Sequence, residues 1–501
     1  MKKLIAVAAS AIALASMAAM EEVAKVRIAD AAGLVSAVTK IGEMSGNGMI
    51  GAVAAAQINE LELFKFFGPA RSGASIALSV MADGDKLDES VEAWGDTVGA
   101  AVLYPIEGKT AFLARYAGAV ETNGFVTVKS DSCKTFSKAY LVFSPDGKWV
   151  AASDKAELAK SALGLVPEAS KPMGADVVKA SVGPKAMKVL VTALEKVAAE
   201  SSAKGEKIVS EKDLAYLKGF ASVSIAVRVN SSGVDLRTKL GAVKGSELDK
   251  MGVKTLAKAP LAFAGANAVS ASAAAEGVDR ASVRDIVDVI VAALAKRGVK
   301  LDFLGLKSVP GRITFDLDVP ALVKYVEGDG AAAFGKIDPE ELVAELRPAI
   351  EAATSKVSPS DRPAFSAALC IKNFTPKASV ATRFEKTLPE VAGKPLYVVS
   401  ASSLYSLVKG VVPQVVASIS PELSGQVKPL LAALPEEGER GMATAYWRDG
   451  DAHVGIFRIS ADEIRGLGAA VNAAMGFAMA NAMQGAGCVD DDDEEDSDDE
   501  D

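Results

Sequence analysis

A strand, a tight turn, a second strand and a helix follow one another without a linker in residues 139–163, and this unit constrains the fold most. Tyr140–Phe143 has the composition of a strand, and Lys148–Ala152 has that of the returning strand. Between them Gly147 suits the left-handed position of a turn. Asp154 has the position of an N-cap for the helix that follows. We therefore expect a hairpin with a helix packed on it.

The same order of elements recurs along the chain. Hairpins are expected at 223–240 and 443–459, each with glycine and Asn or Asp in its turn. A strand at 312–317 leads into Asp318 as a helix cap, which is similar to the pattern of residues 26–38. The chain is therefore predicted to be α+β, with antiparallel β-meanders packed against amphipathic helices in two similar lobes. In the first lobe we expect the helices on one side of the sheet.

Several stretches allow more specific predictions. Thr110–Tyr116 and Lys377–Phe384 have patterns typical of strands, and Met49–Phe67 is typical of one helix. Trp149 and Trp447 each stand beside a hairpin turn, so we expect both rings at the rim of the sheet.

The ends of the chain differ in composition from its body. Residues 1–18, with Lys2 and Lys3 before an apolar run and a small-residue site, are typical of a Sec signal peptide. We therefore expect export to the periplasm or outside the cell. The predicted organisation is a signal peptide at 1–18, a first α+β lobe at 19–203, a second lobe at 213–487 that could subdivide near 355–375, and a disordered acidic tail at 488–501.

Charge is concentrated in the tail. Residues 490–501 hold eleven acids, and removing them from the net charge of −9 leaves +2. Without Lys2 and Lys3 of the signal peptide the body is neutral, so it lacks the basic footprint of a nucleic-acid-binding protein. The tail has nothing apolar to bury and is expected to be disordered. Weak Ca²⁺ capture is the one metal or cofactor hypothesis, with Asp490, Asp491, Asp492 and Asp493 as candidate ligands.

The cysteines, at positions 133, 370 and 488, allow one disulfide at most, and their spacing excludes a C-x-x-C redox or zinc motif. We interpret them as isolated thiols.

Several motif matches lack the context that their chemistry needs. Gly46–Gly51 fits G-x-G-x-x-G but follows a helix rather than a strand, so it is interpreted as an inter-helix connection. Gly108-Lys109-Thr110 lacks the first glycine of a P-loop and is interpreted as a turn in a hairpin. Ser201–Lys204 and Ser406–Lys409 fit S-x-x-K without the companion motifs of penicillin-binding proteins.

The acid–base candidates are few. His453 is the single histidine, and in its strand it alternates with Phe457, which favours a hydrogen-bonded or exposed strand residue over a catalytic base. Asp316 and Asp318 share a strand face and could form a carboxylate pair, although Asp318 already serves as a cap. No catalytic or cofactor-binding residue is assigned.

The last helix, 467–487, is rich in Gly, Ala and Met, with Met475, Met479 and Met483 on one line. We interpret it as a core or partner-packing helix, with membrane contact as the less favoured alternative because Asn472, Asn481 and Gln484 oppose insertion.

The leading functional hypothesis is an exported bacterial envelope protein that acts as a non-catalytic scaffold or binding module. Its partner would be another protein or the cell envelope, engaged through the Met-rich last helix and the acidic tail. The alternatives are an exported hydrolase whose site assembles only in the fold, using His453 or an S-x-x-K lysine, and a binder of an apolar ligand between sheet and helices.

Overall fold

A computed structural model gives the arrangement of the chain in space. It describes residues 21–82, 98–129, 138–203, 214, 217–275, 280–309, 311–355, 365–419 and 421–486. The predicted signal peptide and acidic tail, including Asp490, Asp491, Asp492 and Asp493, lie outside the described residues.

The described residues form seventeen strands. In chain order they are β1 (Glu21–Ile28), β2 (Ile76–Ala82), β3 (Val98–Pro105), β4 (Val120–Thr122), β5 (Phe125–Lys129), β6 (Lys138–Phe143), β7 (Trp149–Ser153), β8 (Asp176–Val182), β9 (Phe220–Asn230), β10 (Gly233–Ala242), β11 (Ala268–Ala274), β12 (Leu304–Val309), β13 (Arg312–Leu317), β14 (Phe365–Ile371), β15 (Leu396–Ser402), β16 (Met442–Asp449) and β17 (Ala452–Ser460).

The helices of the described residues alternate with these strands. They are α2 (Ala31–Ser45), α3 (Gly48–Asn59), α4 (Glu62–Phe67), α6 (Lys109–Leu113), α7 (Ala156–Ala162), α8 (Val166–Ala169), α9 (Pro184–Ala203), α11 (Glu247–Lys250), α12 (Arg280–Lys296), α13 (Val319–Tyr325), α14 (Ala331–Gly335), α15 (Pro339–Ser355), α16 (Val380–Thr387), α17 (Leu404–Ile419), α18 (Pro421–Ala433) and α19 (Ala461–Ala486). Short turns of 3₁₀-helix include η2 (Leu163–Leu165), η3 (Ala262–Ala264) and η6 (Pro389–Val391), and η4 (Val326–Gly330) is a turn of π-helix.

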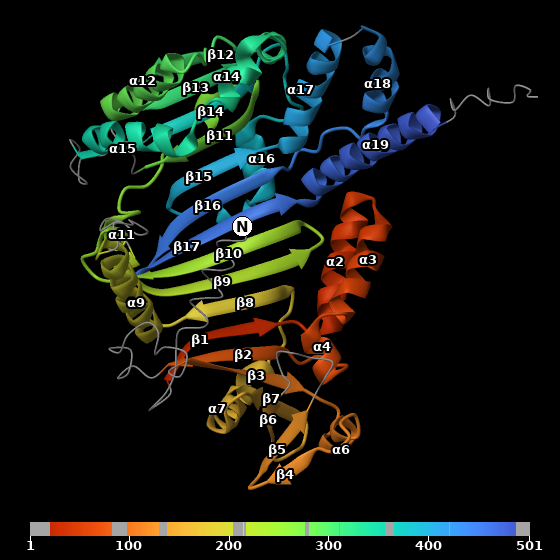
Figure 1. Cartoon of the computed structure of the whole chain (residues 1–501). Helices are drawn as coiled ribbons and strands as arrows, with labels where there is room; N and C mark the ends of the chain where they lie inside the picture. Colours follow the sequence, from red (N-terminus) through yellow and green to blue (C-terminus); the bar gives the residue numbers. More distant parts are fainter. Residues whose placement is uncertain are drawn as a thin grey trace, which may run out of the picture.

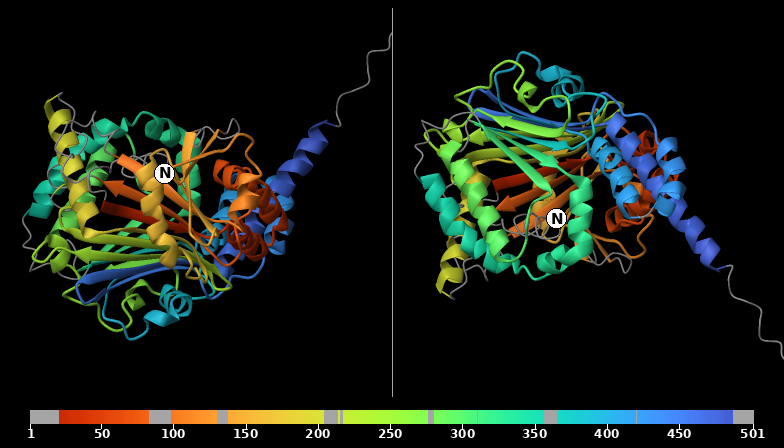
Figure 2. Two further views of the ribbon diagram at one scale, coloured as in Figure 1. Left: turned by 90° about the horizontal axis from the view of Figure 1, so that it is seen from below. Right: turned by 90° about the horizontal axis from the view of Figure 1, so that it is seen from above.

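All seventeen described strands pair into one sheet (Figure 1). From edge to edge the order is β12, β13, β14, β11, β15, β16, β17, β10, β9, β8, β1, β2, β3, β7, β6, β5 and β4. Every pairing is antiparallel except β13 with β14. The sheet twists and curves, as expected for so many strands (Figure 2). The α+β class with an antiparallel sheet is confirmed.

The hairpin β9–β10 occupies the middle of the sheet. Strand β9 pairs with β8 of the N-terminal half, and β10 pairs with β17 near the C-terminus. The sheet therefore joins strands that come before the predicted lobe boundary to strands that come after it, and the predicted division into two similar lobes stays a prediction. At the turn, Asn230 Oδ1 accepts a hydrogen bond from Ser232 N. Gly233 has φ +137°, and a Cβ there would lie 2.0 Å from the Ile459 carbonyl oxygen, so this approach of β10 to β17 requires glycine.

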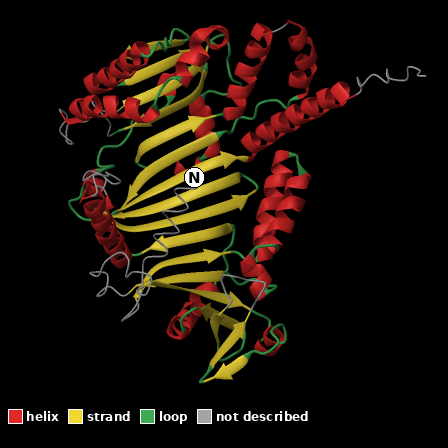
Figure 3. Cartoon of the chain, viewed as in Figure 1, coloured by secondary structure: helices red, strands yellow, loops and turns green. Residues whose placement is uncertain are grey.

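Helices cover both faces of the sheet, contrary to the prediction of helices on one side. On one face, α7 packs against β3 and β7, and α16 packs against β11, β15 and β16. On the opposite face, α9 and α2 contact strands at their two ends, and α13 and α17 cover the far end of β11 and β14. In the view of Figure 3, α9 lies at one end of the central strands, and α2 and α3 lie at the other end.

Two predicted strands are helices. Residues 110–116 contribute to α6, because Phe112 buries its ring against Phe67 and Phe143. Residues 377–384 enter α16, where Ser379 caps the helix by accepting a hydrogen bond from Thr382 N. A local alternation of apolar residues predicted strands here, and tertiary packing overrode it.

Three smaller predictions are also wrong. Asp154 does not cap α7, which begins at Ala156 and has no side-chain cap; the Asp154 carboxylate instead accepts a hydrogen bond from Ser153. Met49–Phe67 is two helices, α3 and α4, separated at Leu61. Trp149 is 2% exposed, in the core beneath α7 rather than at the rim.

Two predicted N-cap residues are confirmed, because their side chains accept hydrogen bonds from backbone N–H groups in the first turn of the helix. Asp30 accepts a hydrogen bond from Gly33 N at the start of α2, and Asp318 does the same for Ala321 N at the start of α13. The three hairpins predicted at 140–152, 223–240 and 443–459 are all present.

Leu158 tests the packing of α7 on the sheet. It is fully buried, and its Cδ1 occupies the space that a side chain at Gly99 would need. Leu158→Ala should lower the free energy of unfolding by about 2–5 kcal/mol, because it removes buried methyl groups and leaves a cavity. Leu404→Ala, at a 43% exposed position, should change it by about 0.5 kcal/mol or less. Urea unfolding measures both, and equal losses would contradict this packing.

Candidate functional site

The five central strands β17, β10, β9, β8 and β1 have two chemically different faces. On one face the register brings together side chains that are apolar apart from Thr238 and the buried His453, and we call this the apolar face. Besides His453 and Gly455, its members are Phe457 and Ile459; Val234, Leu236, Thr238 and Leu240; Val223, Ile225, Val227 and Val229; Val178, Ala180 and Val182; and Ala24, Val26 and Ile28.

The apolar face is partly exposed. Of its valine, leucine, isoleucine and phenylalanine side chains, Val229 is buried, Ile225 and Leu236 are exposed, and the others are half-buried. Ile225 is 38% exposed and Leu236 is 39% exposed, and they are diagonal neighbours on β9 and β10. In Figure 1 this part of the sheet lies between α9 at one end of the strands and α2, α3 and α19 at the other.

The opposite side of the same strands, which we call the charged face, carries mostly ionisable and hydroxyl groups. Its members are Arg458; Asp235, Arg237 and Lys239; Ser222, Ser224, Ala226 and Arg228; Asp176, Lys179 and Ser181; and Lys25 and Arg27, with Val454 and Ile456 completing β17. The charged face lies between two buried cores, one under α7 and one under α16.

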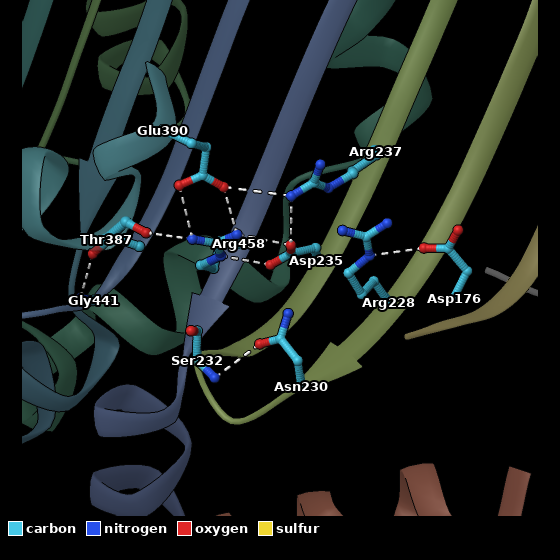
Figure 4. A network of polar contacts seen from close by, with 10 residues as sticks. All are labelled: Asp176, Arg228, Asn230, Ser232, Asp235, Arg237, Thr387, Glu390, Gly441 and Arg458. Atoms are coloured by element: carbon cyan, nitrogen blue, oxygen red, sulfur yellow. Dashed lines mark hydrogen bonds and ion pairs between the residues drawn. The ribbon is translucent and has the colours of Figure 1, made fainter. Parts of the chain in front are cut away.

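Arg458 and Asp235 form the most buried ion pair of the charged face (Figure 4). The guanidinium donates to both carboxylate oxygens, with Nε–Oδ1 and Nη2–Oδ2 distances of 2.5 and 2.8 Å. Arg458 also binds Glu390 of η6, at 2.6 Å, and the Thr387 carbonyl oxygen, at 2.8 Å. Arg237 reaches Asp235 and Glu390 at 3.2 and 3.4 Å. Two arginines and two acids therefore neutralise one another and fasten η6 to the sheet.

The electrostatics of Asp235 follow from this geometry. Burial raises the pKa of this carboxyl, but hydrogen bonds and charge from Arg458 and Arg237 together outweigh burial, so its pKa lies below the ordinary value. Asp176 is similar: burial opposes ionisation, and Arg228 at 2.8 Å with Lys179 at 2.6 Å lowers its pKa overall. Both acids are ionised at neutral pH and act as fixed counter-ions.

A second buried network joins α16, α17 and the loop before β16. Arg383, 1% exposed, donates to Glu437 and to Ser406 Oγ, each at 2.8 Å, and Ser406 donates to Glu437 at 2.8 Å. Glu463 at the start of α19 accepts hydrogen bonds from Tyr405 N and Ser403 Oγ at 2.8 and 2.9 Å. Burial nevertheless raises the pKa of Glu463 above its ordinary value.

The structure does not bring the predicted acid–base candidates together. Lys409 turns away from Ser406 and donates to the Pro435 carbonyl oxygen at 3.1 Å. His453 is fully buried, with Nδ1 3.0 Å from the Tyr397 hydroxyl, which agrees with a hydrogen-bonded strand histidine. Asp316 pairs with Lys307. Each of these side chains has a partner elsewhere in the fold, and none of them meets another candidate.

The other sequence motifs are also accounted for by local structure. Gly46–Gly51 connects α2 to α3, and Asn47 caps α3 by accepting a hydrogen bond from Met49 N. Lys109 begins the short helix α6, not a hairpin, and pairs with Glu121 at 2.9 Å. Asp318 pairs with Lys372 at 2.6 Å in addition to capping α13. Cys370 is a buried free thiol, while Cys133, Cys488 and Lys204 lie outside the described residues.

Hollows open at several places on the described surface. One of about 490 Å³ lies beside α2 and α4 and is lined mainly by apolar groups such as Val35, Phe64 and Pro69. One of about 360 Å³ lies on the other side of the start of α2, near Lys40. Another, of about 270 Å³, lies over β1, β8, β9 and β10 and contains lysines and serines. Within the described part of the chain, no group of three or more His, Cys, Asp or Glu is placed to hold a metal ion.

Comparison with known proteins assigns no family. No protein-family model, curated protein or solved structure matches the chain. Function therefore has to be inferred from the two faces and the hollows themselves.

Helix α19 carries a separate apolar stripe. Val471, Met475 and Met479 recur every four residues and are 56%, 45% and 68% exposed. The last part of α19 extends beyond the rest of the molecule (Figures 1 and 2). None of the helices in the described ranges is long and apolar enough to cross a bilayer.

Sequence reasoning missed both faces of the central strands. The alternation in Val223–Val229 and Val234–Leu240 was visible as a hairpin pattern, and the same alternation contains the apolar face. Nothing in the sequence shows that these strands lie in mid-sheet, or that the described helices leave their centres uncovered.

Asp235→Asn tests the buried ion pair. At pH 7 it should lower the free energy of unfolding by about 3 kcal/mol, because Arg458 loses one of its two carboxylate partners inside the protein. The pKa of Asp235 is lower in the folded protein than in the unfolded chain, where it is about 3.9. The stabilisation that the ionised carboxylate gives to the fold is therefore complete above about pH 3.9, and it is lost as the pH falls through the lower pKa of the folded state. The difference between wild type and Asp235→Asn should therefore shrink below about pH 4. Urea unfolding from pH 7 to 3 measures this, and a constant difference would contradict it.

Proposed function

We propose that this chain is an exported, non-catalytic binding protein that holds an elongated apolar ligand, such as an acyl chain, on the apolar face. Export is supported by the pattern of Lys2, Lys3 and the apolar run that follows them. Binding is supported by one observation above all: a wide, uncharged face of valine, leucine and isoleucine that no helix of the described residues covers at its centre.

Such a face is costly to leave in water. Burial of apolar surface stabilises by about 25 cal/mol per Å², and soluble proteins rarely keep large contiguous apolar patches without a function. Because Ile225 and Leu236 are adjacent and each more than a third exposed, a hydrocarbon chain lying on β9 and β10 would cover both. The flanking helices α9 and α2 would limit its length along the strands.

The buried charges support a non-catalytic role. Asp235 and Arg458 neutralise each other, and Glu437 neutralises Arg383. These charged groups therefore stabilise the fold and are not available for catalysis. The hydrolase alternative would need Ser406 or His453 to reach a substrate, and both side chains are fully buried.

Ligand binding is tested by placing a charge on the apolar face. Ile225→Glu and Leu236→Glu should each weaken binding of a fluorescent fatty acid by about tenfold or more, because each removes apolar contact and forces a carboxylate against hydrocarbon. Val343→Glu, at a 51% exposed position on α15, is the matched control and should leave the affinity unchanged. Fluorescence titration of the full chain, with thermal melts to verify folding, measures this. Equal affinities in all four proteins would refute the proposal.

A second candidate function is attachment to a protein partner through α19. The exposed stripe of Val471, Met475 and Met479 has the spacing by which an amphipathic helix enters an apolar groove, and methionine adapts well to such surfaces.

A photo-crosslinking residue at position 479 tests the attachment to a partner. It should give one discrete protein adduct in cells, and Met475→Glu should reduce its yield at least severalfold, because the charge disrupts the shared apolar stripe. The same residue placed at position 160, an exposed lysine of α7, is the control. Adducts with lipid instead of protein would favour the membrane alternative and contradict a protein partner.

A further inference from the structure

The hollow of about 270 Å³ over β1, β8, β9 and β10 differs in character from the rest of the charged face. Its lining includes two lysines and three serines: Lys25, Lys239, Ser181, Ser222 and Ser224. These side chains offer ammonium and hydroxyl hydrogens, and no carboxylate lines the hollow.

The strand register places four of these groups in one row. Lys25 stands opposite Ser181, Ser181 opposite Ser224, and Ser224 opposite Lys239. Neighbouring strands are about 4.8 Å apart, so the row spans four strands with a lysine at each end and hydroxyls between them. A group bound over the serines can be reached by both long lysine side chains.

Lys239, Ser181 and Ser224 differ from Lys25 in their partners. Among the described residues, Lys239 has no ion-pair partner and the side chains of Ser181 and Ser224 have no hydrogen-bond partner. Lys25 is held by Glu168 of α8 at 2.6 Å, with both side chains about one-third exposed. The acid therefore competes with any anion for one of the two lysines.

Gly241 leaves space for the Ser222 hydroxyl at one end of the hollow. It stands opposite Ser222, and a Cβ at Gly241 would lie 2.4 Å from the Ser222 hydroxyl oxygen. The glycine thus leaves room for that hydroxyl beside the row.

The surrounding charges favour a negative ligand. The next row along the strands carries Arg27, Lys179 and Arg237, of which Lys179 pairs with Asp176, and Arg237 with Asp235 and Glu390. Arg228 and Arg458 also pair with these acids. With Lys25 and Lys239 these make seven cations against four acids, Glu168, Asp176, Asp235 and Glu390, so the described charges around the serines are net positive.

We propose that this hollow binds a phosphate-type oxyanion, with Lys239 and Lys25 supplying charge and the hydroxyls of Ser181 and Ser224 donating hydrogen bonds. A phosphoryl group suits the site because it offers several acceptor oxygens and up to two negative charges to donors arriving from both sides. The site lies on the charged face, so it is independent of ligand binding on the apolar face.

Isothermal titration calorimetry of the full chain with inorganic phosphate at low ionic strength tests the site. Lys239→Gln should weaken binding about tenfold, because a charge-assisted contact is lost. Glu168→Gln should strengthen binding severalfold, because it removes a carboxylate that competes with the anion for Lys25. Lys160→Gln, at an exposed lysine of α7, should have no effect. A gain of affinity in Glu168→Gln cannot arise from damage to the fold.

Vesicles distinguish the source of the phosphoryl group. Flotation of the protein with phosphatidylglycerol vesicles, but not with phosphatidylcholine vesicles, and its loss in Lys239→Gln would assign a lipid head group. Binding of phosphate without flotation would assign a free phosphate or soluble phosphoester. Absence of both kinds of binding, or affinities that do not change in Lys239→Gln and Glu168→Gln, would overturn the proposal.

Discussion

The structure depends on the pairing of one hairpin with both halves of the chain. Strand β9 takes its partner β8 from residues before the hairpin, and β10 takes β17 from residues more than two hundred positions later. Gly233 permits the close approach at the turn, because any side chain there would strike the Ile459 backbone. The backbone hydrogen bonds of this hairpin make seventeen described strands one sheet, so the two halves share a continuous backbone ladder.

Placing the hairpin in mid-sheet leaves the central strands with little helical cover. The cores lie to either side, under α7 and under α16, while the helices on the opposite face stand at the strand ends. The period of two then separates apolar from charged side chains across the same backbone. We propose that one face holds hydrocarbon; the other combines internal ion pairs with the row of lysine and serine side chains from Lys25 to Lys239. Both proposed binding surfaces are consequences of this single placement.

The ion pairs of the charged face have an architectural explanation. Arg458 is buried and must be neutralised, and Asp235 with Glu390 supplies the charge while connecting η6 to the sheet. Lys239 differs because it is exposed and has no described acid beside it. Arg458, whose charge is neutralised by acids, has a structural role. Lys239, which has no described acid partner, is available to a ligand.

The sequence by itself determined the local elements. Asp30, Asp318 and the turn at Asn230–Gly233 satisfy or position their own backbone neighbours, so their roles were predictable without tertiary information. It misassigned residues 110–116 and 377–384, where burial of Phe112 and of Arg383 with Phe384 selected helices. Strand order, the exposure of Ile225 and Leu236, and the row from Lys25 to Lys239 were decided only by tertiary structure. They depend on pairings between residues far apart in the chain, and the period of an isolated strand reveals which side chains share a face but not what lies over that face.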